Sequence, residues 1–194
     1  MTAFVRARIY PALALLVLLT VITGVIYPMV VWAVGQVAFH DQANGSLIVV
    51  DGKTVGSTLI GQAFSDPKYF WGRPSAAGSN GYDANGSAGS NLGPTSKALI
   101  DRITADVDRL RAANGGGPVP VDLVTTSASG LDPDISPAAA EYQVARVAAA
   151  RGISEAAVRA AIARHTDQPL FGFIGKPTVN VLELNLDLGG ALAH

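Results

Sequence analysis

The chain has 194 residues, of which 49% are hydrophobic and only 15% are charged. Soluble domains usually carry about 25% charged residues, so this composition argues against disorder and against a conventional cytosolic surface. The net charge of −1 provides no basic field that would attract nucleic acid. The sequence contains no cysteine, which excludes a disulfide scaffold, a thiolate metal site and a cysteine nucleophile. A chain of this length accommodates one modest domain and one additional element.

The N-terminal part of the chain is apolar over a length that crosses a membrane. No Asp, Glu, Lys or Arg occurs in residues 9–39, and a helix of that length, at about 1.5 Å per residue, exceeds the roughly 30 Å thickness of the hydrocarbon core. Tyr10 near one end and Tyr27 and Trp32 near the other are spaced like two interfacial aromatic belts. Pro28 is expected to kink the helix.

Basic residues flank this apolar segment on one side only. Arg6 and Arg8 precede it, and the next basic residue is Lys53. The positive-inside rule therefore places the N-terminus in the cytoplasm and the rest of the chain outside. We predict a cytoplasmic N-terminus over 1–8, a transmembrane anchor helix with an extracytoplasmic extension over 9–40, and an extracytoplasmic domain over 41–194.

A cleavable signal peptide is the alternative interpretation of the same segment. Ala33-Val34-Gly35 resembles a cleavage site. Signal peptides, however, have apolar regions of only about 7–15 residues, and this one is longer. The sequence favours an uncleaved anchor, and a mature protein beginning near Gln36 would contradict it.

The remaining 154 residues, with a net charge of −3, predict an α+β (mixed α/β) domain. Asp51-Gly52 between two β-branched runs, Ser46–Val50 and Lys53–Ile60, indicates a hairpin. Strands are also expected at Val121–Thr125 and, from its alternating apolar residues, at Thr178–Leu188.

Three helices are predicted from their capping residues. Pro94 is expected at the first position of a helix that ends at Asn114. Ser136 is expected to cap a second helix that ends at Gly152, and Ser154 to cap a third. The third helix is expected to end at His165, a position where an imidazolium would meet the C-terminal dipole.

Residues 72–94 contain six Gly, four Ser, four Ala and three Asn, and offer almost nothing to bury. Loops longer than about 12–15 residues without structure of their own are usually functional or disordered, and composition alone leaves both readings open.

The sequence contains few groups that suggest catalysis. Ser65 and Lys68 have the Ser-x-x-Lys spacing of penicillin-recognising enzymes, although Pro67 disfavours the helix that this motif requires. A membrane-anchored hydrolase using this pair is therefore an alternative function. Asp132 and Asp134 are two carboxylates that a cation would share, but a turn explains them better. The histidines, His40, His165 and His194, lack metal-ligand spacing, so we expect neither a catalytic nor a metal site.

Several longer motifs carry a family resemblance. In chain order they are Gly56–Gln62, Tyr69–Ala76 (Tyr-Phe-Trp-Gly-Arg-Pro-Ser-Ala), Gly89–Pro94, Asp122–Thr125, Ser127–Pro133, Ile135–Pro137 and Val179–Asn185. The chain resembles the C chain of the high-affinity potassium-transporting ATPase, the Kdp complex, from the apolar segment to about residue 188. One departure is Lys176, where the family usually has an acidic residue before the proline.

The resemblance implies a non-catalytic accessory subunit in a bacterial plasma membrane. Its implied partners, besides membrane lipid, are a channel-like A subunit that conducts potassium and a P-type B subunit that hydrolyses ATP. The chain itself is expected to bind no cofactor firmly. The resemblance implies a connection with ATP only because members of the family are held to assist nucleotide binding by the B subunit. The residues implied for that role are Ser127, Ser129, Gly130 and Gln143, which the expected topology places outside the cell, whereas ATP is cytoplasmic.

The same resemblance suggests that the domain lies over the extracytoplasmic mouth of the ion-conducting subunit. Thr20 and Gly24, small residues four positions apart, would allow close packing of the anchor helix against a partner. The remaining interface candidates are Trp71, Arg73, Asn85, Ser90 and Asn91, of which the asparagines would present carbonyl oxygens near the pore.

Overall fold

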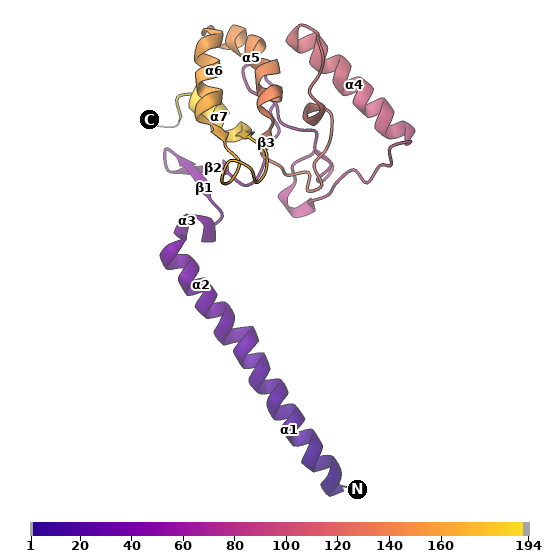
Figure 1. Ribbon diagram of the computed structural model, residues 1–194, viewed down its shortest axis with the longest axis vertical. Helices are drawn as coiled ribbons and strands as arrows, with labels where there is room; N and C mark the ends of the chain where they lie inside the picture. The colour runs from indigo at the N-terminus through magenta and orange to yellow at the C-terminus, as the bar shows by residue number, and fades with distance from the viewer. Residues whose placement is uncertain (1, 192–194) are drawn as a thin grey trace. The chain divides into compact units, whose positions relative to one another are not determined.

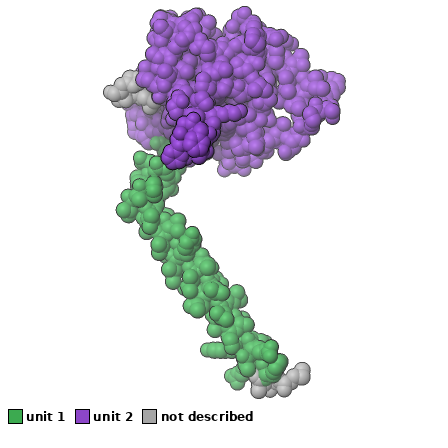
Figure 2. Space-filling model, viewed as in Figure 1, with its two compact units in different colours: residues 1–47 green, residues 48–194 purple. Residues whose placement is uncertain are grey.

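The computed structural model describes residues 2–191, so His194 lies outside the described part of the chain. The chain forms two compact units, residues 1–47 and residues 48–194 (Figure 2). The first is a helical rod and the second is a mixed helix and sheet domain (Figure 1).

The rod is an almost continuous helix. Its elements are α1 (Thr2–Val21), the π-helical turn η1 (Ile22–Ile26), α2 (Tyr27–Ala38) and the short α3 (His40–Ala43). The stretch Phe4–Ala38 is long and apolar enough to cross a membrane, and the window that meets this test has no residue buried within the chain. Apolar side chains on all sides of a helix require an apolar surrounding, which agrees with the expected anchor.

The helix is irregular next to Pro28. The Tyr27 N–H donates to the Ile22 carbonyl, five residues back, which defines the π turn. Proline lacks an N–H, and its ring crowds the carbonyl four residues earlier, here that of Gly24. A widened turn provides room for that ring, so the disruption expected at Pro28 takes the form of a π turn immediately before it.

The domain begins with the expected hairpin. Strands β1 (Leu47–Val50) and β2 (Lys53–Ser57) pair in a two-stranded sheet. Asp51 and Gly52 both have positive φ, 49° and 76°. This combination is the requirement of a type I′ turn, whose twist matches that of the flanking strands.

A second sheet has three short strands in the order β3-β5-β4, all antiparallel. They are β3 (Asp134–Ile135), β4 (Thr166–Asp167) and β5 (Thr178–Asn180). Val179 of the central strand is opposite Ile135 on one side and Thr166 on the other.

Within its described residues the domain has four further helices, α4 (Lys97–Asn114), α5 (Pro137–Arg151), α6 (Glu155–Arg164) and α7 (Val181–Leu188), and the short 3₁₀ turns η2 (Ala84–Gly86) and η3 (Val121–Leu123). The predicted caps of α5 and α6 are confirmed, because the Ser136 and Ser154 hydroxyls accept from the backbone N–H three residues on. Helix α4 ends at Asn114 as expected, but it begins at Lys97 and not at Pro94, so the predicted start was wrong.

Two strand predictions were wrong. Val121–Thr125 contains the 3₁₀ turn η3, which is closed by the Val124 N–H donating to the Val121 carbonyl, and the Thr125 hydroxyl donates to the same carbonyl. Only the first three residues of Thr178–Leu188 are a strand, because the Asn180 side chain accepts from the Glu183 N–H and starts α7. The apolar positions of this segment fit both the two-residue period of a strand and the 3.6-residue period of a helix. Burial of the apolar stripe on the helix favours the helix.

The core lies where α5 packs against α4, α6 and β5. Val144 and Val147 of α5, Val158 of α6 and Leu184 of α7 are at most 1% exposed. Phe70 is also fully buried in this cluster although it belongs to a loop. Burial of Phe70 therefore holds the loop that carries it against the helices.

Candidate functional site

Two loops of the domain, residues 72–94 and 125–132, bind each other and are called the loop pair here. The Ser75 hydroxyl connects them by donating to the Gly130 carbonyl at 2.6 Å. The same oxygen accepts from the N–H groups of Ala77 and Tyr82, at 3.1 and 2.7 Å. Ala77 is fully buried. Residues 72–94 are therefore an ordered loop, in spite of their Gly- and Ser-rich composition.

Gly130 is the point of closest approach between the two loops. Its φ is +66°, and a Cβ there would lie 2.6 Å from the Ala88 carbonyl oxygen and 2.8 Å from the Ala77 nitrogen. Next to it, the Ser129 carbonyl accepts from the Ala88 N–H and from the Ser87 hydroxyl, both at 3.0 Å. The position requires glycine both for its backbone conformation and for space.

The hydroxyls of Ser127 and Ser129 stabilise the turn that carries Gly130. Ser127 Oγ accepts from the Gly130 N–H at 2.9 Å, and Ser129 Oγ accepts from the Leu131 N–H at 3.1 Å. Three of the four expected nucleotide residues thus lie together in one turn.

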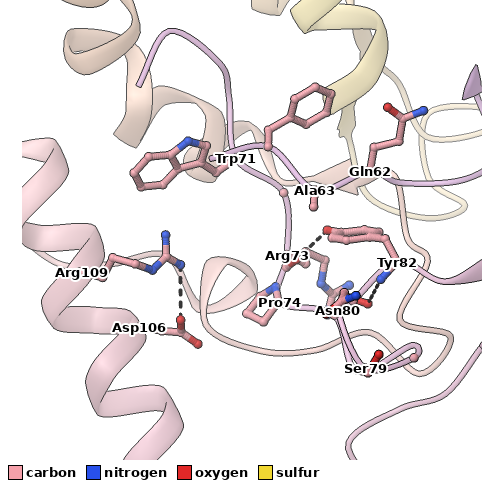
Figure 3. A pocket seen from close by; sticks show the side chains of 15 residues that line it. Gln62, Ala63, Trp71, Arg73, Pro74, Ser79, Asn80, Tyr82, Asp106 and Arg109 are labelled. Atoms are coloured by element: carbon pink, nitrogen blue, oxygen red, sulfur yellow. Dashed lines mark hydrogen bonds and ion pairs between the residues drawn. The ribbon is translucent and has the colours of Figure 1, made fainter. Parts of the chain in front are cut away.

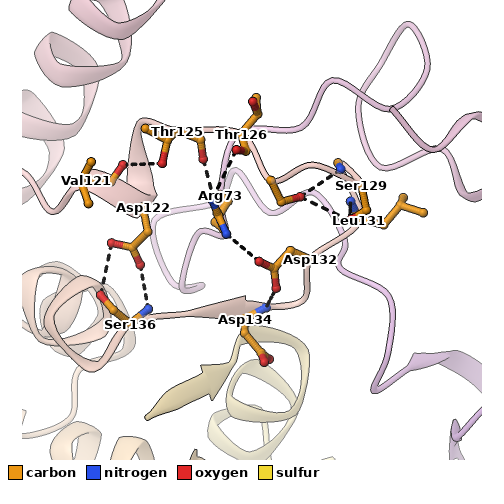
Figure 4. Close-up of polar contacts among 12 residues, drawn as sticks. Arg73, Val121, Asp122, Thr125, Thr126, Ser129, Leu131, Asp132, Asp134 and Ser136 are labelled. Carbon is orange, nitrogen blue, oxygen red and sulfur yellow. Dashed lines mark hydrogen bonds and ion pairs between the residues drawn. The ribbon is translucent and has the colours of Figure 1, made fainter. Parts of the chain in front are cut away.

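Arg73 ties the ends of the loop pair together (Figure 4). Its guanidinium donates to Asp132 Oδ2 at 2.7 Å and to the carbonyls of Thr125 and Thr126, each at 3.3 Å. The other carboxylate oxygen of Asp132 accepts from the Asp134 N–H at 3.0 Å. One planar cation therefore holds three acceptors of the second loop in fixed positions, a geometry that a lysine does not reproduce.

A cavity of about 340 Å³ lies between the first loop and α4 (Figure 3). Tyr82 lines it and donates its hydroxyl to the Arg73 carbonyl at 2.6 Å. Burial, with a further contribution from Asp132, raises the pKa of Tyr82 to about 12. Arg109 extends from α4 toward Trp71, with its guanidinium carbon 5.2 Å from the ring centroid, and it pairs with Asp106. The walls thus combine aromatic surface with charges that are already paired.

Another cavity of about 350 Å³ lies beside β3 and is lined by Asp132, Asp134 and Lys176, among others. Burial raises the pKa of Asp134, and the nearby carboxylates of Asp132, Asp167 and Glu183 act in the same direction. The carboxylate of Asp132 is paired with the guanidinium of Arg73. Among the described residues no group of three His, Cys, Asp or Glu side chains is arranged to hold a metal ion.

Gln143, the fourth residue implied in nucleotide binding, is fully buried on α5. Its Oε1 accepts from the Trp71 N–H at 2.9 Å, and its Nε2 donates to the Trp71 carbonyl at 3.1 Å and to the Ala139 carbonyl at 3.2 Å. The described hydrogen bonds of Gln143 do not reach Ser127, Ser129 or Gly130. The amide serves the backbone of the loop that carries Trp71.

Asn185 on α7 makes the equivalent pair of bonds to the preceding residue. It accepts from the Phe70 N–H at 2.7 Å and donates to the Phe70 carbonyl at 3.0 Å. Two amide side chains therefore supply the hydrogen bonds that a neighbouring strand would give to Phe70 and Trp71. We did not predict this role for Asn185; an amide within the apolar stripe of a helix is the sequence signal for it.

Arg146 completes this buried network. It donates to Gln143 Oε1 and to the carbonyls of Pro67 and Tyr69, and its guanidinium lies 4.0 Å from the Trp71 ring centroid. Burial lowers the pKa of Arg146 to about 10, so it remains charged at neutral pH. We did not predict a role for Arg146 either.

The interface candidates occupy different environments. Asn85 and Asn91 are exposed and Ser90 is half-buried, all on the first loop of the pair. Trp71 is only 9% exposed and belongs to the core, which leaves little of it for an intermolecular contact. In the rod, a Cβ on Gly24 would lie 4.0 Å from Thr20 Cγ2, so these two small residues adjoin on one face.

The Ser65 and Lys68 pair does not form the arrangement that a hydrolase requires. The segment is a turn, with the Lys68 N–H donating to the Asp66 carboxylate. The Lys68 ammonium lies 3.6 Å from the same carboxylate and over the Tyr69 ring. The amine is thus directed to an acid and not to the Ser65 hydroxyl.

Taken together, the described residues define an α+β domain that follows one helix long and apolar enough to cross a membrane, and whose polar loop residues hold its own loops together. Comparison with known proteins agrees with this class and narrows it. The family described as "KdpC: K+-transporting ATPase, c chain" matches residues 9–190, so the chain belongs to this family.

Curated relatives match over nearly their whole length. The "Potassium-transporting ATPase KdpC subunit" of Sorangium cellulosum is 60% identical over 95% of this chain and 98% of the relative. The proteins of the same name from Koribacter versatilis and Variovorax paradoxus are 52% and 56% identical, each over 95% of this chain. The family resemblance read from the sequence is confirmed.

Proposed function

We propose that this chain is the non-catalytic accessory subunit of an ATP-driven potassium uptake complex. In this role it assembles and stabilises an ion-conducting A subunit and an ATP-hydrolysing B subunit, whose chains carry the transport and the chemistry. Membership of the family supports the proposal. The observation that carries the finer role is the loop pair, in which Arg73, Ser75 and Gly130 hold two loops together as one surface.

We further propose that the domain is extracytoplasmic. Arg6 and Arg8, which precede the uncharged stretch 9–39, and the absence of Lys or Arg between them and Lys53 support this orientation. The exposed Asn85 and Asn91 on the loop pair would then face the side from which potassium arrives, where they would influence ion access locally.

The contacts of the residues implied in nucleotide binding favour an indirect role for them. Ser127, Ser129 and Gln143 all use their side chains to bind backbone groups of this chain. ATP affinity of the complex would then depend on these residues through the positions of the loops they hold.

Replacing residues 75–91 with a short Gly-Ser linker tests the assembly role. We expect reduced recovery of the A and B subunits with this chain in mild detergent, or an altered potassium affinity of the complex. The matched control changes Ala105 and Asp108, two exposed positions on α4 outside the loop pair, to Gln. Unchanged recovery and transport in the linker variant would remove the loop from the function.

The orientation is tested with single cysteines, because the sequence contains none. Asn85→Cys and Ala150→Cys lie at exposed positions. An impermeant maleimide should label both in intact cells. Labelling that occurs only after the cells are broken would place the domain, and a role near ATP, in the cytoplasm.

A further inference from the structure

The connection between β4 and β5 exposes an apolar tip that the family role does not explain. Leu170, Phe171, Phe173 and Ile174 are 61%, 79%, 77% and 52% exposed. Single exposed apolar residues are normal, but four within five positions form a contiguous patch that marks an interaction site. Exposing two phenylalanines to water in a domain that buries Phe70 completely is unfavourable unless another phase covers them.

The backbone of this tip is fixed. The N–H and carbonyl groups of Leu170 and Ile174 bond to each other at 3.1 and 3.0 Å, and the Phe173 N–H donates back to the Leu170 carbonyl. Phe171 and Gly172 at the turn have φ of +54° and +80°. A bulky residue with positive φ is a conformational outlier. The chain therefore holds an apolar residue at a position where Asn or Gly would be less strained.

If the helix 4–38 crosses a membrane, the surface of that bilayer is always near the domain. The candidate span ends at Ala38, and the domain begins at Ile48. Ten residues reach at most about 36 Å, and a domain of this size has a radius of gyration of about 15 Å. Because four of these residues form α3, the actual reach is shorter, and the tether keeps the domain close to the bilayer surface.

The composition of the tip suits the interfacial region of a membrane. Phenylalanine and aliphatic side chains enter the boundary between headgroups and acyl chains, and they do so most readily where no carboxylate accompanies them. Residues 168–177 contain no acidic residue, and their one charged side chain is that of Lys176. A lysine beside an apolar tip is attracted to anionic headgroups.

We propose that the tip formed by Leu170, Phe171, Phe173 and Ile174 inserts into the headgroup and upper acyl region of the bilayer that the helix 4–38 spans, as a second membrane contact of the domain. This contact goes beyond the proposed assembly role, and it rests on the anchoring of the chain by residues 4–38. It would restrict the rotation of the domain about its tether and so limit the orientations in which the loop pair meets a partner.

The test uses the assembled complex in nanodiscs of phosphatidylethanolamine and phosphatidylglycerol. Phe173→Cys is labelled with a polarity-sensitive fluorophore, and quenching is measured with lipids brominated near the headgroup or deep in the acyl chain. We expect a blue-shifted emission that the shallow brominated lipids quench more strongly than the deep ones. Ala150→Cys, at an exposed position of α5 away from the loop pair, is the matched control and should show emission typical of water with no quenching.

Three results would overturn the proposal. Emission typical of water at position 173 would mean that the tip is uncovered. Blue-shifted emission without quenching by either lipid would mean that a protein partner or a second copy covers it. Stronger quenching by the deep lipids than by the shallow ones would contradict an interfacial position. Val17→Cys in the helix reports separately on anchoring: deep quenching there, with none at position 173, rejects the tip contact and leaves the anchor intact.

Discussion

The side-chain amide of Gln143 binds both backbone groups of Trp71, accepting from its N–H at 2.9 Å and donating to its carbonyl at 3.1 Å. Asn185 repeats this arrangement one residue earlier, at Phe70. Two helices thus fix an extended segment without a strand beside it. This segment leads directly into Arg73, which positions the loop pair, so the buried amides connect the core to the proposed interaction surface.

Gln143→Leu is expected to destabilise the domain by about 3 kcal/mol, because it leaves the Trp71 N–H and carbonyl unpaired in the core. Chemical denaturation of the full chain in detergent, followed by tryptophan fluorescence, measures this loss. Ala145→Gln, at an exposed position of the same helix, should change the free energy of unfolding by less than about 0.5 kcal/mol. A Gln143→Leu chain that unfolds like the wild type but loses a nucleotide effect would support a ligand role instead.

Gly130→Ala is expected to loosen the loop pair. A Cβ at this position meets the Ala88 carbonyl oxygen at 2.6 Å, and the positive φ disfavours alanine in addition, for a total of about 3 kcal/mol. Gly116→Ala is the matched control, since its φ is +91° and its Cβ position is open. That variant should lose only the conformational part, about 1 kcal/mol. Equal losses of unfolding free energy in the two variants would show that close contact between the loops at Gly130 adds nothing to the cost of the substitution.

Arg73→Lys should weaken the second loop while the charge is kept. An ammonium cannot donate in a planar fork to Asp132 and to two carbonyls at once, so we expect a loss of about 1–2 kcal/mol. Hydrogen exchange at the Leu131 and Tyr82 amides should become faster. Arg111→Lys, at the exposed end of α4, should leave both amides unchanged. If both amides in the Arg73→Lys chain exchanged as slowly as in the wild type, contacts other than those of Arg73 would hold the loops in place.

Asp187 is expected to make stability depend on pH in acid. Burial opposes its ionisation, but Arg164 and His165, at 2.7 and 2.9 Å from Oδ2, outweigh that effect and lower its pKa. The unfolded chain therefore binds the proton more tightly. Its contribution is complete above the ordinary aspartate pKa of 3.8 and is lost as the pH falls through the lower native value.

Asp187→Asn should accordingly lose about 2 kcal/mol at pH 7 and show a flatter stability curve below pH 4. Urea denaturation across pH 2–7 measures both effects. Asp108→Asn, at an exposed position on α4, should follow the wild-type curve. Parallel curves for Asp187→Asn and the wild type would refute the assignment.

Asp134 is expected to act in the opposite direction, because burial raises its pKa. The native state then holds this proton more tightly than the unfolded chain does, so stability falls as the pH rises from 3.8 through the native value. Asp134→Asn should therefore be more stable than the wild type at pH 7, by less than about 1 kcal/mol, with the advantage disappearing below pH 3.8. Thermal unfolding at pH 7 and pH 3 compares the two. If Asp134→Asn were less stable than the wild type at pH 7, the ionised Asp134 carboxylate would stabilise the native state, which contradicts the prediction.

The sequence by itself determined the features that depend on neighbours in the chain. The apolar helix, the Asp51-Gly52 turn and the serine caps of α5 and α6 follow from hydropathy, backbone preference and hydrogen bonds that span only a few residues. The family motifs were readable for the same reason, since they are continuous in the chain.

Only the tertiary structure decided the features that join distant segments. The alternating residues after Thr178 fit both a strand and a helix, and burial of Val181 and Leu184 with the cap at Asn180 selected α7. The Gly- and Ser-rich loop became ordered because Ser75 and Gly130, 55 positions apart, meet in space. No local pattern encodes which buried amide will satisfy which backbone group, because that pairing depends on how the helices pack.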